Sequence, residues 1–225
     1  MATTIHTPTA TRIPMTTDWL ALTQWLSPAF PLGSFAYSHG LETAISLGEA
    51  RCGQSLTAWI EVVLTDGTGI VDATLLSMVH RGEMEASEAA GMAQALATSA
   101  ERWEETIAQG RAFIKTTNAI LSHSDPALPL PVAVGLVART LNLPTQTVAA
   151  TALHAFTSNL VQAGVRFIPL GQTEGQQVLA ALHPVIDVVA ARAATAHIDD
   201  VTTNAFGADL AAMAHETLDV RIYRT

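Results

Sequence analysis

Histidine and cysteine are the side chains in this sequence whose chemistry best suits metal binding or nucleophilic catalysis. Eight histidines and one cysteine are spread over 225 residues. No histidine lies three to five residues from another histidine or from Cys52, the spacing that places two metal ligands close together on a helix. The sequence therefore predicts no metal-binding motif. A single cysteine excludes an internal disulfide, and we expect Cys52 to be a half-buried small hydrophobe.

The glycine-rich segments do not match a nucleotide or acyl-transfer site. Gly67-Thr68-Gly69 lacks the third glycine of a dinucleotide-binding loop and has no strand before it, so it is predicted to be a turn between helices. The sequence contains no P-loop, and the glycines and serines between Gly33 and Gly40 do not form the G-x-S-x-G elbow of serine hydrolases. We therefore expect neither an enzyme nor a bound cofactor.

Helices must position whatever site exists, because apolar residues recur at steps of three and four through most of the chain. The clearest such stripe runs from Trp103 to Leu121. The predicted fold is all-α, a single-domain bundle of about eight to ten helices over residues 19–215. Residues 1–18 are predicted to be a flexible N-terminal arm, and residues 216–225 a C-terminal tail that docks on a partner.

Prolines divide the predicted bundle into two halves. Ser122–Pro131 contains three prolines, which disfavour helix, so this stretch is predicted to be a linker, either a hinge or a plain loop. Val132–Val137 could be a buried strand by residue type, but Pro131 suits the first position of a helix and no partner strand is visible. We therefore predict a helix there, and another that Pro144 begins.

The charge of the chain argues against two classes of partner. Twenty acidic residues outnumber eleven basic ones, for a net charge of -9, which repels phosphate backbones and anionic lipid heads. The most apolar window, Leu128–Ala138, is about half the roughly 20 residues of a membrane span. No signal-like segment is apparent at the start. We expect a cytoplasmic protein that binds neither nucleic acid nor membrane.

Two segments have patterns that point to contacts with something else. If Phe35–Ser46 is helical, His39 and Glu42 share one face with Phe35, opposite Tyr37 and Leu41. Such a helix is either sandwiched in the core or presents a binding surface. In the tail, apolar and polar residues alternate, as in an extended segment, with Leu218, Val220 and Ile222 on one edge. This edge should dock on the chain's own domain or on a partner.

Three motifs, in order along the chain, resemble those of the UreF-type urease accessory proteins. The first is Ser27–Glu42, with the sequence SPAFPLGSFAYSHGLE. The second is Ser158–Gln176, with the sequence SNLVQAGVRFIPLGQTEGQ. The third starts at His215-Glu216-Thr217 and includes Arg221 and Arg224. Together they span nearly the whole chain after the arm.

The resemblance implies a function in the maturation of nickel urease. It implies an all-α homodimer that assembles with a UreD-type protein, also called UreH, and with the UreG-type GTPase, to deliver nickel to apo-urease. Nickel would then be handled by the assembled complex rather than by a motif in this chain. The residues to which the three motifs assign partner contacts are Pro28, Pro31, Gly33, Ser34, Phe35, Tyr37, Ser38, His39, Glu42, Arg166, Gln172, Glu174, His215, Glu216, Arg221 and Arg224.

Departures from the family pattern leave some details open. Ser34 and Ala36 replace a glycine and a serine common in the first motif, and Leu218-Asp219 replaces the usual Gln-Tyr of the tail. One alternative function is regulation of the partner GTPase, with Arg166 or Arg221 reaching its phosphates. Against this, Arg166 could simply pair with an acidic neighbour.

Overall fold

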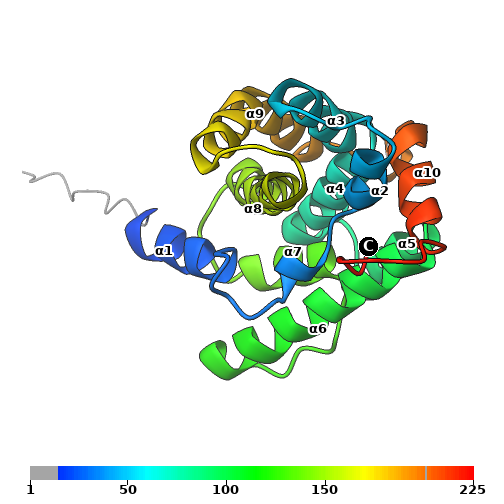
Figure 1. The fold of residues 1–225 in the computed structure, drawn as a ribbon. Helices are drawn as coiled ribbons and strands as arrows, with labels where there is room; N and C mark the ends of the chain where they lie inside the picture. The colour runs from blue at the N-terminus through cyan, green and yellow to red at the C-terminus, as the bar shows by residue number, and fades with distance from the viewer. Residues whose placement is uncertain (1–14, 201) are drawn as a thin grey trace, which may run out of the picture.

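A computed structural model describes residues 15–200 and 202–225, and within them the chain is helical with no β-strand (Figure 1). The predicted all-α fold is confirmed. The helices are α1 (Met15–Trp25), α2 (Leu41–Ser46), α3 (Gly53–Asp66), α4 (Thr68–Arg81), α5 (Ala86–Ala95), α6 (Ala100–Leu121), α7 (Leu130–Ala138), α8 (Thr145–Phe167), α9 (Gln172–Ala193) and α10 (Phe206–His215). Two short 3-10 turns, η1 (Ser34–Ala36) and η2 (Ile198–Asp200), complete them.

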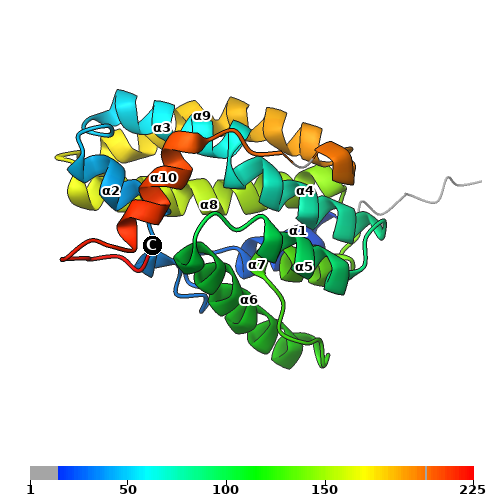
Figure 2. The ribbon, with the colours of Figure 1, turned by 90° about the vertical axis from the view of Figure 1, so that its right-hand side faces the viewer.

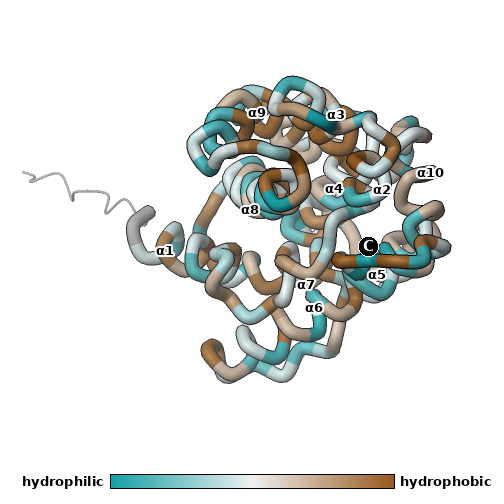
Figure 3. Tube along the Cα trace, in the orientation of Figure 1, coloured by the Kyte–Doolittle hydropathy of each residue, from teal (hydrophilic) through white to brown (hydrophobic). Residues whose placement is uncertain are grey.

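The core lies around α8 and α4. Helix α8 packs along α9 and also against α4, while α4 packs on α7, and α7 on α6 (Figures 1 and 2). Along these helices apolar and polar stretches alternate (Figure 3), as expected for amphipathic helices that bury one face each. Leu75, Val132 and Leu160, from α4, α7 and α8, are completely buried in this shared core.

Local sequence signals account for most helix boundaries. Ser99 caps α6 by accepting a hydrogen bond from the Arg102 backbone N–H at 3.2 Å. Pro131 lies in the first turn of α7, where its missing N–H is not needed, so the choice of helix over strand for Val132–Val137 is confirmed. Gly67 separates α3 from α4, as predicted for the turn.

The structure corrects three local expectations. Helix α1 begins at Met15, so Met15–Asp18, which we assigned to the arm, are helical; Asp18 in the first turn favours the helix N-terminus electrostatically. Residues 1–14, the rest of that arm, lie outside the described residues. Cys52 is exposed rather than half-buried, because it is the N-cap of α3.

A continuous helix over Phe35–Ser46 is also excluded, because the first half of this segment is not α-helical. Helix α2 begins only at Leu41, since His39 and Gly40 both have positive φ, at 58° and 74°. Phe35, His39 and Glu42 therefore do not share a helix face. This change of geometry matters for the site, because it turns the His39 and Glu42 side chains toward α6 and α10.

One stretch, Gly53–Arg81, is long and apolar enough to be a candidate membrane span, with a mean hydropathy of 1.4 over its best window. It is not a single helix, because Gly67 divides it into α3 and α4. Within that window, 72% is buried inside the protein. Its apolar character therefore builds the core of the bundle.

Candidate functional site

The first motif, Ser27–Glu42, forms an irregular segment between α1 and α2. Its course is set by tight turns, such as the bond from the Phe30 N–H to the Ser27 carbonyl at 2.9 Å. At Gly40 the backbone has a positive φ, and a Cβ there would lie 2.6 Å from the Ala212 nitrogen of α10. Only glycine fits this contact, which brings α10 against the end of the segment.

The C-terminal tail lies along this segment and is bound to it by backbone hydrogen bonds. The Arg224 N–H donates to the Ala36 carbonyl at 2.8 Å, and the Ser38 N–H donates to the Thr225 carbonyl at 3.0 Å. The Ser38 hydroxyl also donates to that carbonyl. The tail thus docks on the chain's own domain, one of the two alternatives expected from its sequence. The tail residues that face inward are Tyr223 and Thr225.

The apolar edge predicted for the tail faces water instead. Val220 and Ile222 are 80% and 73% exposed, whereas Tyr223 is 5% exposed and its ring lies 5.3 Å from that of Phe167. The reason is that the backbone N–H groups of Ile222 and Tyr223 bind the Glu42 carboxylate, at 3.0 and 2.9 Å. Hydrogen bonds to a buried carboxylate, rather than apolar alternation, decide which residues face inward.

A chain of charged groups connects Glu42 to α6 and to the tail. The His215 ring lies between two carboxylates: Nδ1 is 2.7 Å from Glu101 and Nε2 is 3.2 Å from Glu42. Arg221 pairs with the second oxygen of Glu101. His215 is fully buried, so its two ring nitrogens depend on these two carboxylates for their hydrogen bonds.

A second buried cluster lies beside the first. Arg102 donates to Glu105 and also to Nδ1 of His39, at 3.0 Å from the latter. Burial, and then the Arg102 charge, lower the pKa of His39, so it is neutral at pH 7 and Nδ1 accepts this bond. Burial alone would raise the pKa of Glu105, but the charge of the nearby Arg102 outweighs it, and that pKa falls to about 2. The Thr225 hydroxyl donates to this carboxylate at 3.0 Å, which ties the tail to α6.

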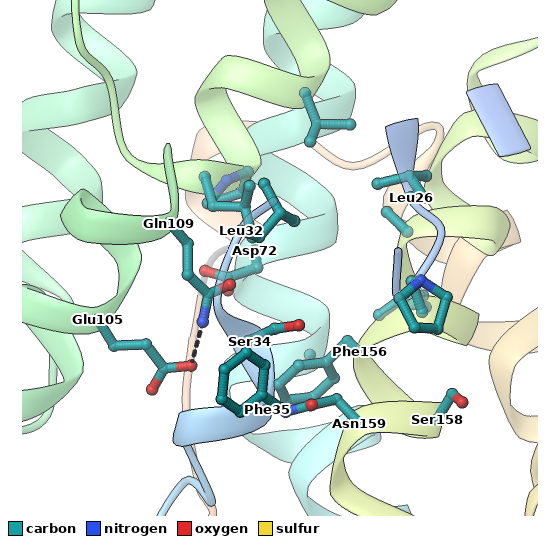
Figure 4. A pocket seen from close by; sticks show the side chains of 18 of the residues that line it. Leu26, Leu32, Ser34, Phe35, Asp72, Glu105, Gln109, Phe156, Ser158 and Asn159 are labelled. Carbon is teal, nitrogen blue, oxygen red and sulfur yellow. Dashed lines mark hydrogen bonds between the residues drawn. The ribbon is translucent and has the colours of Figure 1, made fainter. Parts of the chain in front are cut away.

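A cavity of about 230 Å³ lies next to these clusters, between the first motif and α4, α6, α7 and α8. Its walls are mainly apolar, and Figure 4 shows Phe35 and Phe156 on one side and Asp72 beside Gln109 on the other. Burial raises the pKa of Asp72 to about 7, although one side of the carboxyl faces the cavity. Gln109 does not pair with Asp72 but donates to Glu105 at 2.9 Å.

The arrangement is suited to holding the tail rather than to bond chemistry. Within residues 15–200 and 202–225, no three His, Cys, Asp or Glu side chains come together as metal ligands. The buried acids instead accept bonds from backbone N–H groups, arginines and histidines. What the geometry provides is a fixed position for the tail, with Val220 and Ile222 exposed on it.

The residues that the motifs singled out fall into two groups in the structure. Those that hold the tail or the segment in place are buried: Tyr37, Ser38, His39, Glu42 and His215. Those that are exposed are Pro28, Pro31, Phe35, Arg166, Gln172, Glu174, Glu216, Arg221 and Arg224, while Gly33 and Ser34 are partly buried. Gln172 and Glu174, in the first turn of α9, make no hydrogen bond to the tail. The buried residues could contact a partner directly only if the tail moved away. That any of these residues binds a partner stays a prediction.

Arg166 does not pair with an acidic neighbour. It donates to the Phe35 carbonyl at 3.2 Å and to the Tyr223 hydroxyl at 3.3 Å. The second motif is thereby joined to the first and to the tail. Asn159, also in the second motif, adds a bond from its amide to the Tyr37 carbonyl at 3.2 Å.

Comparison with known proteins shows which family the chain resembles. The family model named UreF matches residues 51–183. A urease accessory protein UreF of Cereibacter sphaeroides strain KD131 is 54% identical over 211 residues, covering 94% of this chain and all of that protein. The UreF of Roseobacter denitrificans is 48% identical over 224 residues, covering 99% of this chain and all of that protein.

The chain belongs to the UreF family of urease accessory proteins. The UreF of a Bradyrhizobium strain, at 43% identity, also covers 91% of this chain and 90% of its own length. The family predicted from the three motifs is therefore confirmed. As members of this family are named accessory proteins, the expectation of a non-catalytic function agrees with the comparison.

Sequence reasoning missed the acids and the arginine that α6 contributes. Glu101 and Arg102 lie four and three residues before Glu105, beside the apolar stripe, a pattern typical of a solvated helix face. In the structure Arg102 and Glu105 are buried. The signal that could have found them is the presence of His39 and Glu42 in the first motif and of His215 in the third. If these side chains are buried, they need charged or polar partners elsewhere in the chain.

Proposed function

We propose that this UreF-family chain is a maturation scaffold that assembles with a UreD/UreH-type protein and a UreG-type GTPase and supports nickel insertion into apo-urease. It acts in the cytoplasm, as a homodimer, and nickel is handled by the assembled complex. The observation that carries the proposal is the tail, which is held by buried charges on one side and exposes apolar side chains on the other.

The tail and α10 together provide the surface that such an assembly needs. Helix α10 exposes Phe206, Leu210 and Met213 at steps of four and three, which places them on one helix face. The adjoining tail exposes Val220 and Ile222, and both elements lie at one side of the bundle (Figure 2). Exposed apolar side chains gathered on neighbouring elements are typical of protein interfaces. We assign this surface to the UreD/UreH-type partner.

Regulation of the GTPase by an arginine of this chain is less well supported. Arg166 is occupied by the Phe35 carbonyl and the Tyr223 hydroxyl, and Arg221 by Glu101. Either guanidinium would have to leave these acceptors in order to reach a nucleotide. The contacts favour a function in assembly for both arginines.

Co-purification of the chain with its UreD/UreH-type and UreG-type partners tests the proposal. Val220→Asp with Ile222→Asp places two charges on the exposed side of the tail without touching its buried bonds. We expect at least a tenfold loss of affinity for the UreD/UreH-type partner and a matching loss of urease activation. A charge at a buried apolar contact has this effect because it is left unpaired.

Val188→Asp is the matched control, because Val188 is 68% exposed on α9, away from the tail. It should bind the partner as the unmodified chain does. If the unmodified chain forms no complex with either protein under any nucleotide condition, the scaffold function is wrong. If Val188→Asp and the tail variant bind equally well, the function can stand but the surface is misassigned.

A further inference from the structure

Two histidines outside the site face each other across neighbouring helices. His154 of α8 and His183 of α9 are exposed, and their ring centres are 5.4 Å apart with the ring planes inclined by 44°. Neither ring makes a hydrogen bond or ion pair with another side chain in the part of the chain that the structure describes. They are 29 positions apart in sequence, so no local motif revealed them.

The helices that carry the two rings hold them in a fixed register. Helices α8 and α9 pack closely along their lengths and run antiparallel, since Gln146 near the start of α8 bonds Asp187 of α9 at 3.1 Å. Both histidines lie well inside their helices, more than two turns from either end. Only their side-chain torsions are free to adjust.

The separation of the rings fits two ligands on one ion. A bound transition metal lies about 2.1 Å from each imidazole nitrogen, and that nitrogen lies about 1.1 Å from its own ring centre. Two rings on a tetrahedral ion then have centres roughly 5.2 Å apart, and on an octahedral ion roughly 4.5 Å apart. The observed 5.4 Å between the ring centres is close to the first distance, and both side chains are exposed and can rotate to aim a nitrogen at a shared ion.

The chemistry of imidazole also suits a transition-metal ion. Neutral imidazole is the form that binds Zn²⁺, Ni²⁺ and Cu²⁺, whereas Mg²⁺ prefers oxygen ligands. The exposed position leaves the remaining coordination sites to water.

We propose that His154 and His183 form a two-histidine surface site that binds a divalent transition-metal ion, Zn²⁺ or Ni²⁺. The bound ion joins α8 to α9. This site goes beyond the scaffold function and does not depend on it. Because the ion contacts both helices only when they are packed, it binds the folded chain in preference to the unfolded one and stabilises it.

Calorimetric titration of the tag-free, full-length chain with Zn²⁺ or Ni²⁺ tests the site. The titration uses a Cys52→Ser background, because the exposed Cys52 thiol is itself a metal ligand and serine is a good N-cap. We expect saturable binding, a rise in Tm with metal concentration, and no binding of Mg²⁺. His154→Ala and His183→Ala should each lower the affinity at least tenfold and abolish the rise in Tm.

His197→Ala removes another exposed histidine outside the pair and should leave the affinity unchanged. Circular dichroism without metal checks that every variant is folded. We expect this result because the substituted positions are exposed. Imidazole signals in NMR spectra should shift on Zn²⁺ addition for His154 and His183 together. No binding to the Cys52→Ser chain at millimolar metal, or equal binding by the His154→Ala and His197→Ala variants, would overturn the proposal.

Discussion

At the scale of single residues, Glu42 connects the first motif to α10 and to the tail. Its carboxylate accepts bonds from the Ile222 and Tyr223 N–H groups and from His215. It is 7% exposed, so each bond replaces one to water. A buried carboxylate in this position sets the path of the tail because backbone donors must come to it.

His215 bonds two of these acids, so its loss should be costly. We expect His215→Ala to lower the free energy of unfolding by about 3 kcal/mol, since it removes a fully buried ring and its bonds to Glu42 and Glu101. Urea denaturation measures the change. Adding Glu42→Gln to this variant should restore part of the loss, because one uncompensated charge is removed.

Thr217→Ala, two positions on and exposed, should change the stability by less than about 0.5 kcal/mol. A loss for His215→Ala no greater than that of Thr217→Ala would show that the two carboxylates do not depend on the ring.

Asp72 should make the stability depend on pH in the neutral range. In the unfolded chain its carboxyl ionises near pH 4, whereas burial keeps its folded pKa at about 7. As pH rises between these values the unfolded state gains charge first, so the free energy of unfolding falls. Asp72→Asn removes this fall, and should be more stable than the unmodified chain above pH 7 by roughly 2 kcal/mol, less than the full shift because the Asp72 side chain is only partly buried.

Glu105→Gln should change the pH dependence of the free energy of unfolding in the opposite direction. The folded pKa of Glu105 is about 2, below its unfolded value, so its contribution is present above about pH 4.5 and lost as pH falls toward 2. The variant should therefore lose stability at neutral pH and approach the unmodified chain in acid. Chemical denaturation from pH 3 to pH 8 checks both variants, and parallel profiles for Asp72→Asn and the unmodified chain would contradict the first.

At the scale of elements, the sequence predicted the long helices well and the site segment poorly. Helices α6, α8 and α9 have uninterrupted apolar periodicity, and α7 begins at a proline, so local signals were sufficient. The segment before α2 has apolar residues at helical spacing, which favours a helix. Spacing does not show that a residue has a positive φ, so the break before Leu41 was not predicted. The positive φ of His39 and Gly40 results from the close approach of α10, which lies 170 residues away in sequence.

The candidate site could be predicted by position but not by mechanism. All three motifs meet in space, which the resemblance implied only through a shared function. Tyr223 rather than Val220 turns inward because the Glu42 carboxylate binds the tail backbone. His215, the side-chain partner of Glu42, is in turn bonded to Glu101 of α6. Contacts among four distant segments leave no trace in the period of any one of them.

Gly40 tests the contact between the first motif and α10. We expect Gly40→Ala to lower the free energy of unfolding by more than about 3 kcal/mol, because the new Cβ would meet the Ala212 backbone at 2.6 Å in addition to the cost of a positive φ. Gly33→Ala is the matched control, since Gly33 has φ of 71° and open space around it. It should cost only about 1 kcal/mol. Equal losses in thermal denaturation would mean that α10 moves aside freely.

At the scale of the whole molecule, close helix crossings rather than large side chains set the shape of the core. A Cβ at Gly135 of α7 would lie 2.4 Å from the Leu76 carbonyl of α4, so these two helices touch through their backbones. Trp25 and Phe113 are the large rings buried nearby, in an edge-to-face contact at 6.5 Å. The bundle is therefore intolerant of added volume at the crossing.

Gly135→Ala should destabilise the whole bundle, because α4 and α7 would have to separate. We expect a loss of more than about 2 kcal/mol in urea denaturation. Gly91→Ala, in α5 with nothing near its Cβ position, should instead raise the stability by about 0.5 to 1 kcal/mol through helix propensity. A stabilised Gly135→Ala variant would contradict the backbone contact.

The pairing of Ser38 with Thr225 has a consequence for the order of events during synthesis. Residues 38–42 leave the ribosome well before the groups that bind them, which lie between His215 and Thr225. Until then Glu42 has neither its ring nor its backbone donors, and burying it is unfavourable. The helices of the core can pack as they emerge, yet the first motif must wait for residues 215–225 before it can take its final form. A chain whose translation stalls before His215 would therefore lack the bonds that fix the first motif.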